Sequence, residues 1–195
     1  DMGPPAVLEQ INRTGVEVAI VPEEHSVLGV KAKVKCIAEI VNKKIEAERL
    51  FEEKLDPAIN KLEIASQKVL EKNTKAIFIL GLQSGSPLIG GMDTSANGLI
   101  EMIGAKNVLS SFEGWKPVST ESILMAEPDV ILISNRGLSA FGDVESLRQH
   151  PALALTPAAK NNNIIAMDGM AMLGFGPRTI FSALNIANDI LDIND

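Results

Sequence analysis

The sequence predicts an α/β protein in which two Rossmann-like lobes with parallel sheets are joined by one long helix, the first lobe being incomplete. Two observations lead to this prediction. Residues 42–72 lack an internal glycine and repeat apolar residues among many Glu and Lys, which is typical of a long surface helix. After that, short apolar strands alternate with helical segments to the end of the chain. The predicted parts are a first-lobe remnant at 1–41, an inter-lobe helix at 42–73 and a C-terminal lobe at 74–195.

The predicted inter-lobe helix is long enough to act as a strut. At a rise of about 1.5 Å per residue, roughly thirty residues of helix span about 45 Å, which exceeds the width of a small domain. Pro57 cannot donate the backbone hydrogen bond of a regular helix, so we expect a bend where it follows Asp56. A rod of this length favours a two-lobed binding protein over an enzyme.

The first forty residues predict two helices and one strand. A helix is expected at 5–13, with Gly15 as its C-terminal stop. The β-branched run 16–21 predicts a strand. Ser26 is a suitable N-cap for a helix that continues to about residue 41. The apolar residues of that helix expected to face the core are Val30, Val34, Ile37, Ala38 and Val41.

The opening residues of the chain have the composition of a loop that leaves a strand and enters a helix. Residues 1–5 read Asp-Met-Gly-Pro-Pro, and proline is favoured in the first turn of a helix. We therefore expect that a segment of the first lobe precedes this chain. A lobe without some of its strands would expose sheet edges, which predicts that the chain can dimerise through them.

The C-terminal part predicts a buried parallel sheet covered by helices on both faces. Its expected strands are 76–80, 130–133 and 164–167, and its main helices are 95–103, 120–126 and 177–191. Residue 93 or 94 is expected to cap the first of these helices and Ser119 the second. In such sheets, ligands bind outside the carboxyl ends of the strands. The loops predicted to leave those ends, and so to form a cleft wall, are 81–94, 134–142 and 168–176.

Composition excludes several functional classes. The net charge is −7 and the pI about 4.9, with no basic cluster, so nucleic acid is not an expected partner. The only cysteine, Cys36, fits a small apolar packing role. His25 and His150 lie far apart without nearby ligand-type side chains, which predicts solvated histidines rather than a zinc site. No nucleophile stands near an evident base, so the chain is not predicted to be an enzyme.

Three side chains near the predicted cleft are candidates for ligand binding. Arg136 follows a buried strand, and its planar guanidinium suits either a ligand carboxylate or a salt bridge within the protein. Trp115 stands in a Gly- and Pro-containing loop, where a tryptophan either lines an apolar pocket or seals the lobe edge. Arg178 opens the last helix and either bonds neighbouring carbonyls or meets a ligand carboxylate.

Several stretches of the second lobe resemble periplasmic heme-binding proteins of ABC importers, which belong with cobalamin and siderophore binders to the class III periplasmic binding proteins. Residues 3–10 and on to 21 resemble the end of that family's N-terminal lobe. The stretches that resemble its C-terminal lobe are 112–121 (Phe-Glu-Gly-Trp-Lys-Pro-Val-Ser-Thr-Glu), 127–132 (Glu-Pro-Asp-Val-Ile-Leu), 136–142 (Arg-Gly-Leu-Ser-Ala-Phe-Gly), 150–157 (His-Pro-Ala-Leu-Ala-Leu-Thr-Pro) and 172–178 (Met-Leu-Gly-Phe-Gly-Pro-Arg).

The resemblance implies that heme is held in a cleft between the lobes. Arg136 matches the family's arginine near the heme edge, while Trp115, Met92 and 173–175, with Leu173 and Phe175, would supply apolar walls. The family usually holds the iron with a tyrosinate of the N-terminal lobe. This chain contains no tyrosine, so the axial ligand has no counterpart here and most of the heme affinity is expected to be lost.

The resemblance also implies a partner and a compartment. Family members work in the periplasm and deliver their ligand to a permease and ATPase complex in the inner membrane, docking through one surface glutamate on each lobe. Glu121 is the candidate on the second lobe and Glu9 on the first. A ferric siderophore or cobalamin is the alternative ligand. A non-catalytic two-domain α/β subunit, such as a metal-cluster scaffold, is a further alternative, which the single cysteine disfavours.

Overall fold

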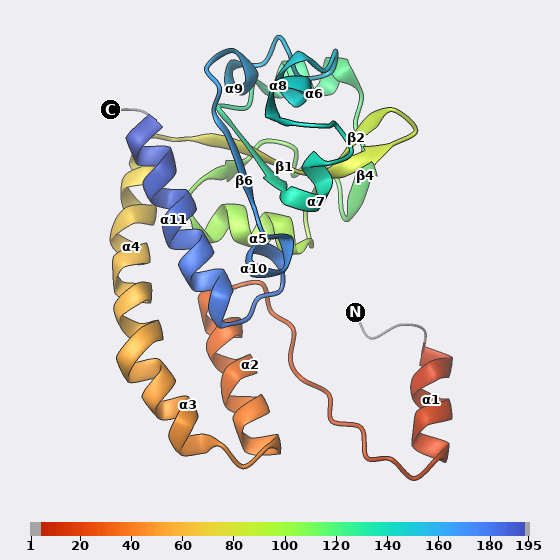
Figure 1. The fold of residues 1–195 in the computed structure, drawn as a ribbon, viewed down its shortest axis with the longest axis vertical. Helices are drawn as coiled ribbons and strands as arrows, with labels where there is room; N and C mark the ends of the chain where they lie inside the picture. Colours follow the sequence, from red (N-terminus) through yellow and green to blue (C-terminus); the bar gives the residue numbers. More distant parts are fainter. Residues whose placement is uncertain (1–4, 194–195) are drawn as a thin grey trace.

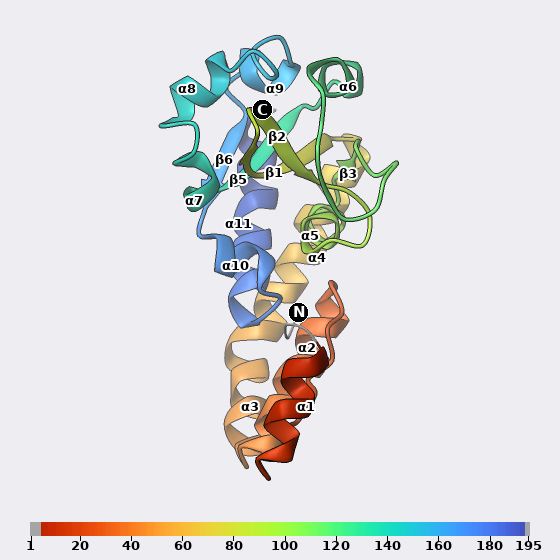
Figure 2. The ribbon, with the colours of Figure 1, turned by 90° about the vertical axis from the view of Figure 1, so that its right-hand side faces the viewer.

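The computed structural model describes residues 5–193, which form an α/β lobe continued by a helical stem (Figures 1 and 2). Among the described residues, no helix has both the length and the apolar character needed to cross a bilayer. The strands are β1 (Lys75–Gln83), β2 (Ser86–Gly90), β3 (Lys106–Asn107), β4 (Trp115–Pro117), β5 (Val130–Ser134) and β6 (Ile164–Met167). The helices are α1 (Pro5–Arg13), α2 (Val27–Ile40), α3 (Lys44–Leu50), η1 (Phe51–Leu55), α4 (Asp56–Glu71), α5 (Ser95–Met102), α6 (Thr120–Ala126), α7 (Asn135–Leu138), α8 (Val144–Gln149), α9 (Pro157–Lys160), α10 (Gly169–Leu173) and α11 (Pro177–Ile193).

The predicted α/β class is confirmed, and the sheet is mostly parallel, with antiparallel pairs at one edge that the sequence did not predict. Its order is β4-β2-β1-β5-β6, with β3 pairing to β1 outside this path. β1, β5 and β6 run parallel as expected, but β2 is antiparallel to both β1 and β4. Most of the predicted cleft loop 81–94 is therefore a hairpin. Its two-residue turn has positive φ at Ser84 (50°) and Gly85 (81°), a twist that suits two antiparallel strands.

The alternation of side chains along β1 divides the core into two layers. Phe78 and Ala76 pack with α4, α5 and α11 on one face, and Ile77 and Ile79 pack with α6, α8 and α9 on the other. Because successive side chains of a strand point to opposite faces, a continuous apolar run is needed where both faces are covered. All four of these residues are fully buried.

The long helix is confirmed from Lys44 to Glu71, and it contains a π turn shortly before Pro57. The π turn, η1, stands directly before Pro57, and the N–H of Asp56 donates to the carbonyl of Phe51. In a π turn, each N–H donates to the carbonyl five residues earlier instead of four. The helix therefore continues past Pro57, which has no N–H to donate. The second half, α4, does not stand free but packs along α11, and α2 and α3 pack against each other to form the stem (Figure 2).

The segment before α2 departs from the prediction. Residues 14 and 15 form a turn, and residues 16–24 pair with no strand, so the predicted strand 16–21 is not formed, and Val16 and Ile20 are 58% and 76% exposed. A strand requires a neighbour, and within residues 5–193 none lies beside this segment. Figure 1 shows α1 set apart at its far end. The helix capped by Ser26 is confirmed, since the serine hydroxyl accepts from the N–H of Gly29 at 3.0 Å.

The inward face of α2 is narrower than the sequence predicted. Val30, Val34 and Ala38 are buried as expected. Ile37 and Val41 are instead 45% and 53% exposed, because only one stripe of the helix meets α11 and α3.

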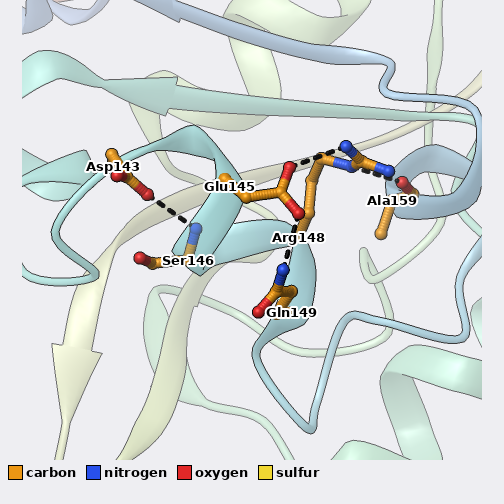
Figure 3. Close-up of polar contacts among 6 residues, drawn as sticks. All are labelled: Asp143, Glu145, Ser146, Arg148, Gln149 and Ala159. Atoms are coloured by element: carbon orange, nitrogen blue, oxygen red, sulfur yellow. Dashed lines mark hydrogen bonds and ion pairs between the residues drawn. The ribbon is translucent and has the colours of Figure 1, made fainter.

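A polar network joins α8 to α9 on the outer face of the lobe (Figure 3). Arg148 Nε donates to the carbonyl of Ala159 at 3.0 Å, and its guanidinium also reaches Glu145 at 2.8 Å. Asp143 caps α8 by accepting from the N–H of Ser146 at 2.7 Å. That hydrogen bond holds the pKa of the Asp143 carboxyl below its usual value.

We expect Asp143→Ala to lower the stability of the protein at pH 7 and to lose this effect in acid. Because the folded-state pKa of Asp143 is depressed, its stabilisation is present above the unfolded pKa of about 3.9 and disappears as the pH falls through the lower folded value. Urea unfolding of both proteins from pH 7 to pH 2.5 tests this. A difference in unfolding free energy that stays constant across the range would contradict it.

Candidate functional site

Two short helices begin at the carboxyl ends of the parallel strands and place the main candidate residues there. Ser134, the last residue of β5, caps α7 by accepting from the N–H of Gly137 at 2.9 Å. A Cβ on Gly137 would lie 2.5 Å from the carbonyl oxygen of Leu80, so only glycine lets α7 pack this closely on β1. Arg136 is carried on this helix and is exposed. The predicted position of an arginine after a buried strand is thus observed.

Met92 and Trp115 come together at the β2–β4 edge of the sheet. Gly90 of β2 pairs with Trp115, and the N–H of Met92 donates to the carbonyl of Phe112 at 2.7 Å. Trp115 is half-buried and meets the ring of Phe78 edge-on, with 6.1 Å between ring centroids. Met92 is 45% exposed. Trp115 therefore covers the core with part of its ring, and an exposed methionine stands at the same edge of the sheet.

The α10–α11 turn holds the remaining apolar candidates. Leu173 is half-buried against the core layer that contains Phe78. Phe175 is fully buried, with its ring centroid 4.9 Å from that of His25. The ring of Phe175 is thus enclosed by the protein, and its role as a wall of a ligand cleft stays a prediction.

The charged candidates of the second lobe are exposed. The Arg178 side chain is 71% exposed, with a guanidinium nitrogen 3.8 Å from Asp168 Oδ1. Asp168 also caps α10 by accepting from the N–H of Ala171 at 2.7 Å. Arg178 thus has one ion-pair partner within the protein and remains open to a ligand.

The two docking candidates are exposed helix residues. Glu121 lies in the first turn of α6, where its own backbone N–H and the Ser119 hydroxyl hold the pKa of its carboxyl below the usual value. Glu9 lies on α1, 3.9 Å from the guanidinium of Arg13 in an exposed ion pair.

Both histidines are packed rather than solvated, which corrects the prediction. His25 is half-buried against Phe175, and His150 is half-buried with its ring centroid 5.3 Å from that of Phe141. His25 packs on Phe175 of the distant α10–α11 turn, and His150 packs on Phe141 before α8. No local sequence pattern indicates either contact. Within residues 5–193, no group of three or more His, Cys, Asp and Glu side chains is placed to hold a metal ion.

Sequence reasoning also missed Asn107, a buried polar residue that organises the β2–β4 edge. Its side-chain amide donates to the carbonyl of Gly90 at 3.1 Å and to Asn97 Oδ1 at 2.9 Å, and its oxygen accepts from the N–H of Leu109 at 3.1 Å. A lone asparagine after a helix stop gives no signal of such a role.

Two solved structures are similar to this chain over nearly its whole length. RhuT from Roseiflexus sp. RS-1, a periplasmic heme-binding protein in its apo form, is 28% identical with a TM-score of 0.88, and the match covers 99% of this chain and 73% of RhuT. The periplasmic heme-binding protein HutB of Vibrio cholerae is 32% identical with a TM-score of 0.81, and the match covers 97% of this chain and 73% of HutB.

A further relative is the ABC transporter substrate-binding lipoprotein YvrC of Bacillus subtilis (strain 168). It is 21% identical over 183 residues, which are 94% of this chain and 56% of YvrC. The chain therefore spans little more than half the length of this relative. A family profile described as periplasmic binding protein matches residues 2–171. With most of its length matched by that profile and its fold shared with RhuT and HutB, the chain belongs to the periplasmic binding protein family.

Proposed function

We propose that this chain belongs to a periplasmic substrate-binding protein that delivers heme to an ABC importer. The heme assignment is supported by RhuT and HutB, which are heme-binding proteins with TM-scores of 0.88 and 0.81 to this chain. The transport role is supported by YvrC, a substrate-binding lipoprotein of an ABC transporter. In this proposal, residues 1–41 belong to the first lobe, 42–73 connect the lobes and 74–195 form the second lobe. We propose no catalytic activity.

Arg136 is the residue that carries the ligand assignment. It places an exposed guanidinium at the carboxyl end of β5, where ligands of α/β proteins bind, and a guanidinium pairs well with a propionate carboxylate. Met92, Trp115 and Leu173 would supply apolar surface for the porphyrin, and Arg178 a second positive charge. We assign no axial iron ligand within this chain, which contains no tyrosine.

The exposed glutamates fit a docking role toward the permease and ATPase complex. Glu121 is exposed, and the pKa of its carboxyl lies below the usual value, so a charged carboxylate is available to a basic surface of the permease at neutral pH, as for any exposed glutamate. Glu9 would serve the first lobe in the same way.

Replacing Arg136 by alanine is expected to weaken hemin binding about tenfold, equivalent to the loss of about 1.4 kcal/mol of pairing with propionate. Soret absorbance titrations of hemin into the parent chain and the variant measure this. The matched control is Arg49→Ala, an exposed arginine of the stem that is 3.9 Å from Glu53 and lies outside the proposed site. Equal affinities for Arg136→Ala and the parent would remove Arg136 from the site.

The identity of the ligand is tested on the same protein. We expect hemin to bind more tightly than cobalamin or a ferric siderophore in parallel titrations. If cobalamin or the ferric siderophore binds more tightly than hemin, that compound becomes the proposed ligand, and the proposed transport role is unchanged. Binding of none of the three would contradict the proposed function for this chain and favour a non-catalytic α/β subunit.

A further inference from the structure

A set of contacts joins the segment before and within α2 to the α10–α11 turn. Lys33 Nζ donates to the carbonyl of Gly174 at 3.3 Å and to Glu23 Oε1 at 3.0 Å. The Lys33 side chain is only 13% exposed, so these two oxygens replace most of the water around its charge. The same bond from Lys33 holds the pKa of the Glu23 carboxyl below its usual value. The ammonium group of Lys33 therefore links Glu23 to the backbone of Gly174.

His25 adds an aromatic contact to the same turn. Its ring lies 4.9 Å from that of Phe175, at an interplanar angle of 53°, and its Nε2 is 4.0 Å from Glu23 Oε1. On its other side, a Cβ on Gly98 would lie 2.4 Å from the backbone oxygen of His25, which shows how closely α5 approaches. His25 is therefore wedged between α5 and the turn.

The turn itself has a conformation that depends on its surroundings. Phe175 has a φ of 44°, in the left-handed region that disfavours side chains with a Cβ. It is nevertheless fully buried between Gly174 and Gly176. A residue in this conformation persists only where neighbouring contacts hold it, and the neighbours here include His25 and Lys33.

We propose that Glu23, His25 and Lys33 form a turn clamp that positions the α10–α11 turn for ligand binding. The inference rests on the proposed function, because Leu173 and Arg178 of this turn are residues that would meet heme. His25 and Lys33 are positioning residues, since they act through Gly174 and Phe175. The clamp joins a part of the chain assigned to the first lobe to the ligand-facing turn of the second.

The structure offers a matched control for His25 and another for Lys33. His150 makes a comparable ring contact, 5.3 Å from Phe141, on the opposite part of the lobe. Lys31 lies on the same helix as Lys33 and pairs with Asp56 at 2.8 Å. The test variants are His25→Ala and Lys33→Met, the controls are His150→Ala and Lys31→Met, and His25→Phe retains a ring that can pack on Phe175.

Hydrogen exchange of the ligand-free chain tests the clamp without reference to heme. In His25→Ala and Lys33→Met, we expect amides of residues 169–178 to exchange roughly tenfold faster than in the parent, because the turn opens locally. The two controls should leave this segment unchanged, and His25→Phe should restore its protection. Unchanged exchange of 169–178 in both clamp variants, or an equal increase in the controls, would overturn the proposal.

Hemin binding then tests what the clamp does for the ligand. We expect His25→Ala to weaken hemin binding about three- to tenfold, because the α10–α11 turn is no longer held in its binding conformation. The change should appear in the dissociation rate of hemin. Faster exchange together with unaltered hemin affinity would overturn the positioning role. If the parent chain binds no hemin, the proposed function fails, while the exchange measurements still decide whether the clamp holds the turn.

Discussion

Phe78→Ala is expected to destabilise the protein by about 3–5 kcal/mol and to change the environment of Trp115. Phe78 is fully buried in the middle of the sheet, and its ring supports the edge of Trp115 at a centroid distance of 6.1 Å. Alanine at this position leaves a cavity beneath the indole as well as losing the transfer free energy of the phenyl ring. A loss of this size is a large fraction of the stability of a typical domain, about 5–15 kcal/mol.

Urea unfolding followed by fluorescence measures both effects at once. The chain has one tryptophan and no tyrosine, so emission on excitation in the near ultraviolet reports Trp115. We expect red-shifted emission of the folded variant. The matched control is Phe181→Ala on α11, where the ring is already 38% exposed and the expected loss is about 1 kcal/mol. Equal losses in the two variants, or unshifted emission in Phe78→Ala, would show that Trp115 does not rest on Phe78.

The local features of this fold were predictable, because the residues that determine them are adjacent in sequence. Ser26, Thr94 and Ser119 each accept a hydrogen bond from a backbone N–H three residues further on, as expected of N-caps. The same holds for the position of Arg136 after β5, which follows from chain order alone.

The failures concern features that depend on residues far away in sequence. The run 16–21 has the composition of a strand but finds no strand beside it within the described residues, whereas Ser86–Gly90 forms one because β1 and β4 flank it. One of the contacts of the buried Phe175 ring is with His25, a residue far earlier in the sequence. Sequence pattern indicates which segments can pair or pack, and tertiary contacts select among them. The position of Arg136 after a buried strand could therefore be predicted, whereas the enclosure of Phe175 could not, and the roles of both residues in ligand binding stay predictions.

Asn107 gives the second large expected effect, because it is a buried residue whose polar atoms are satisfied by three different parts of the fold. Asn107→Ala leaves the carbonyl of Gly90, the N–H of Leu109 and the side chain of Asn97 without this partner, and we expect a loss of about 3 kcal/mol. Urea unfolding measures the loss. Asn97→Ala is the matched control, since it removes one of the bonds to Asn107 together with an exposed bond to Glu101 at 2.8 Å, and its expected cost is about 1 kcal/mol.

Asn107→Asp sharpens the test through its dependence on pH. At neutral pH a carboxylate would face two acceptors, the carbonyl of Gly90 and Asn97 Oδ1, which favours the protonated form and raises its folded-state pKa. The folded state then binds the proton more tightly than the unfolded state, so the stability deficit should shrink as the pH falls from the raised value toward about 4. A deficit independent of pH would show that the amide does not donate to these oxygens. Since Gly90 pairs with Trp115 and leads into Met92, the same variants should also weaken hemin binding at neutral pH if this edge of the sheet contacts the ligand.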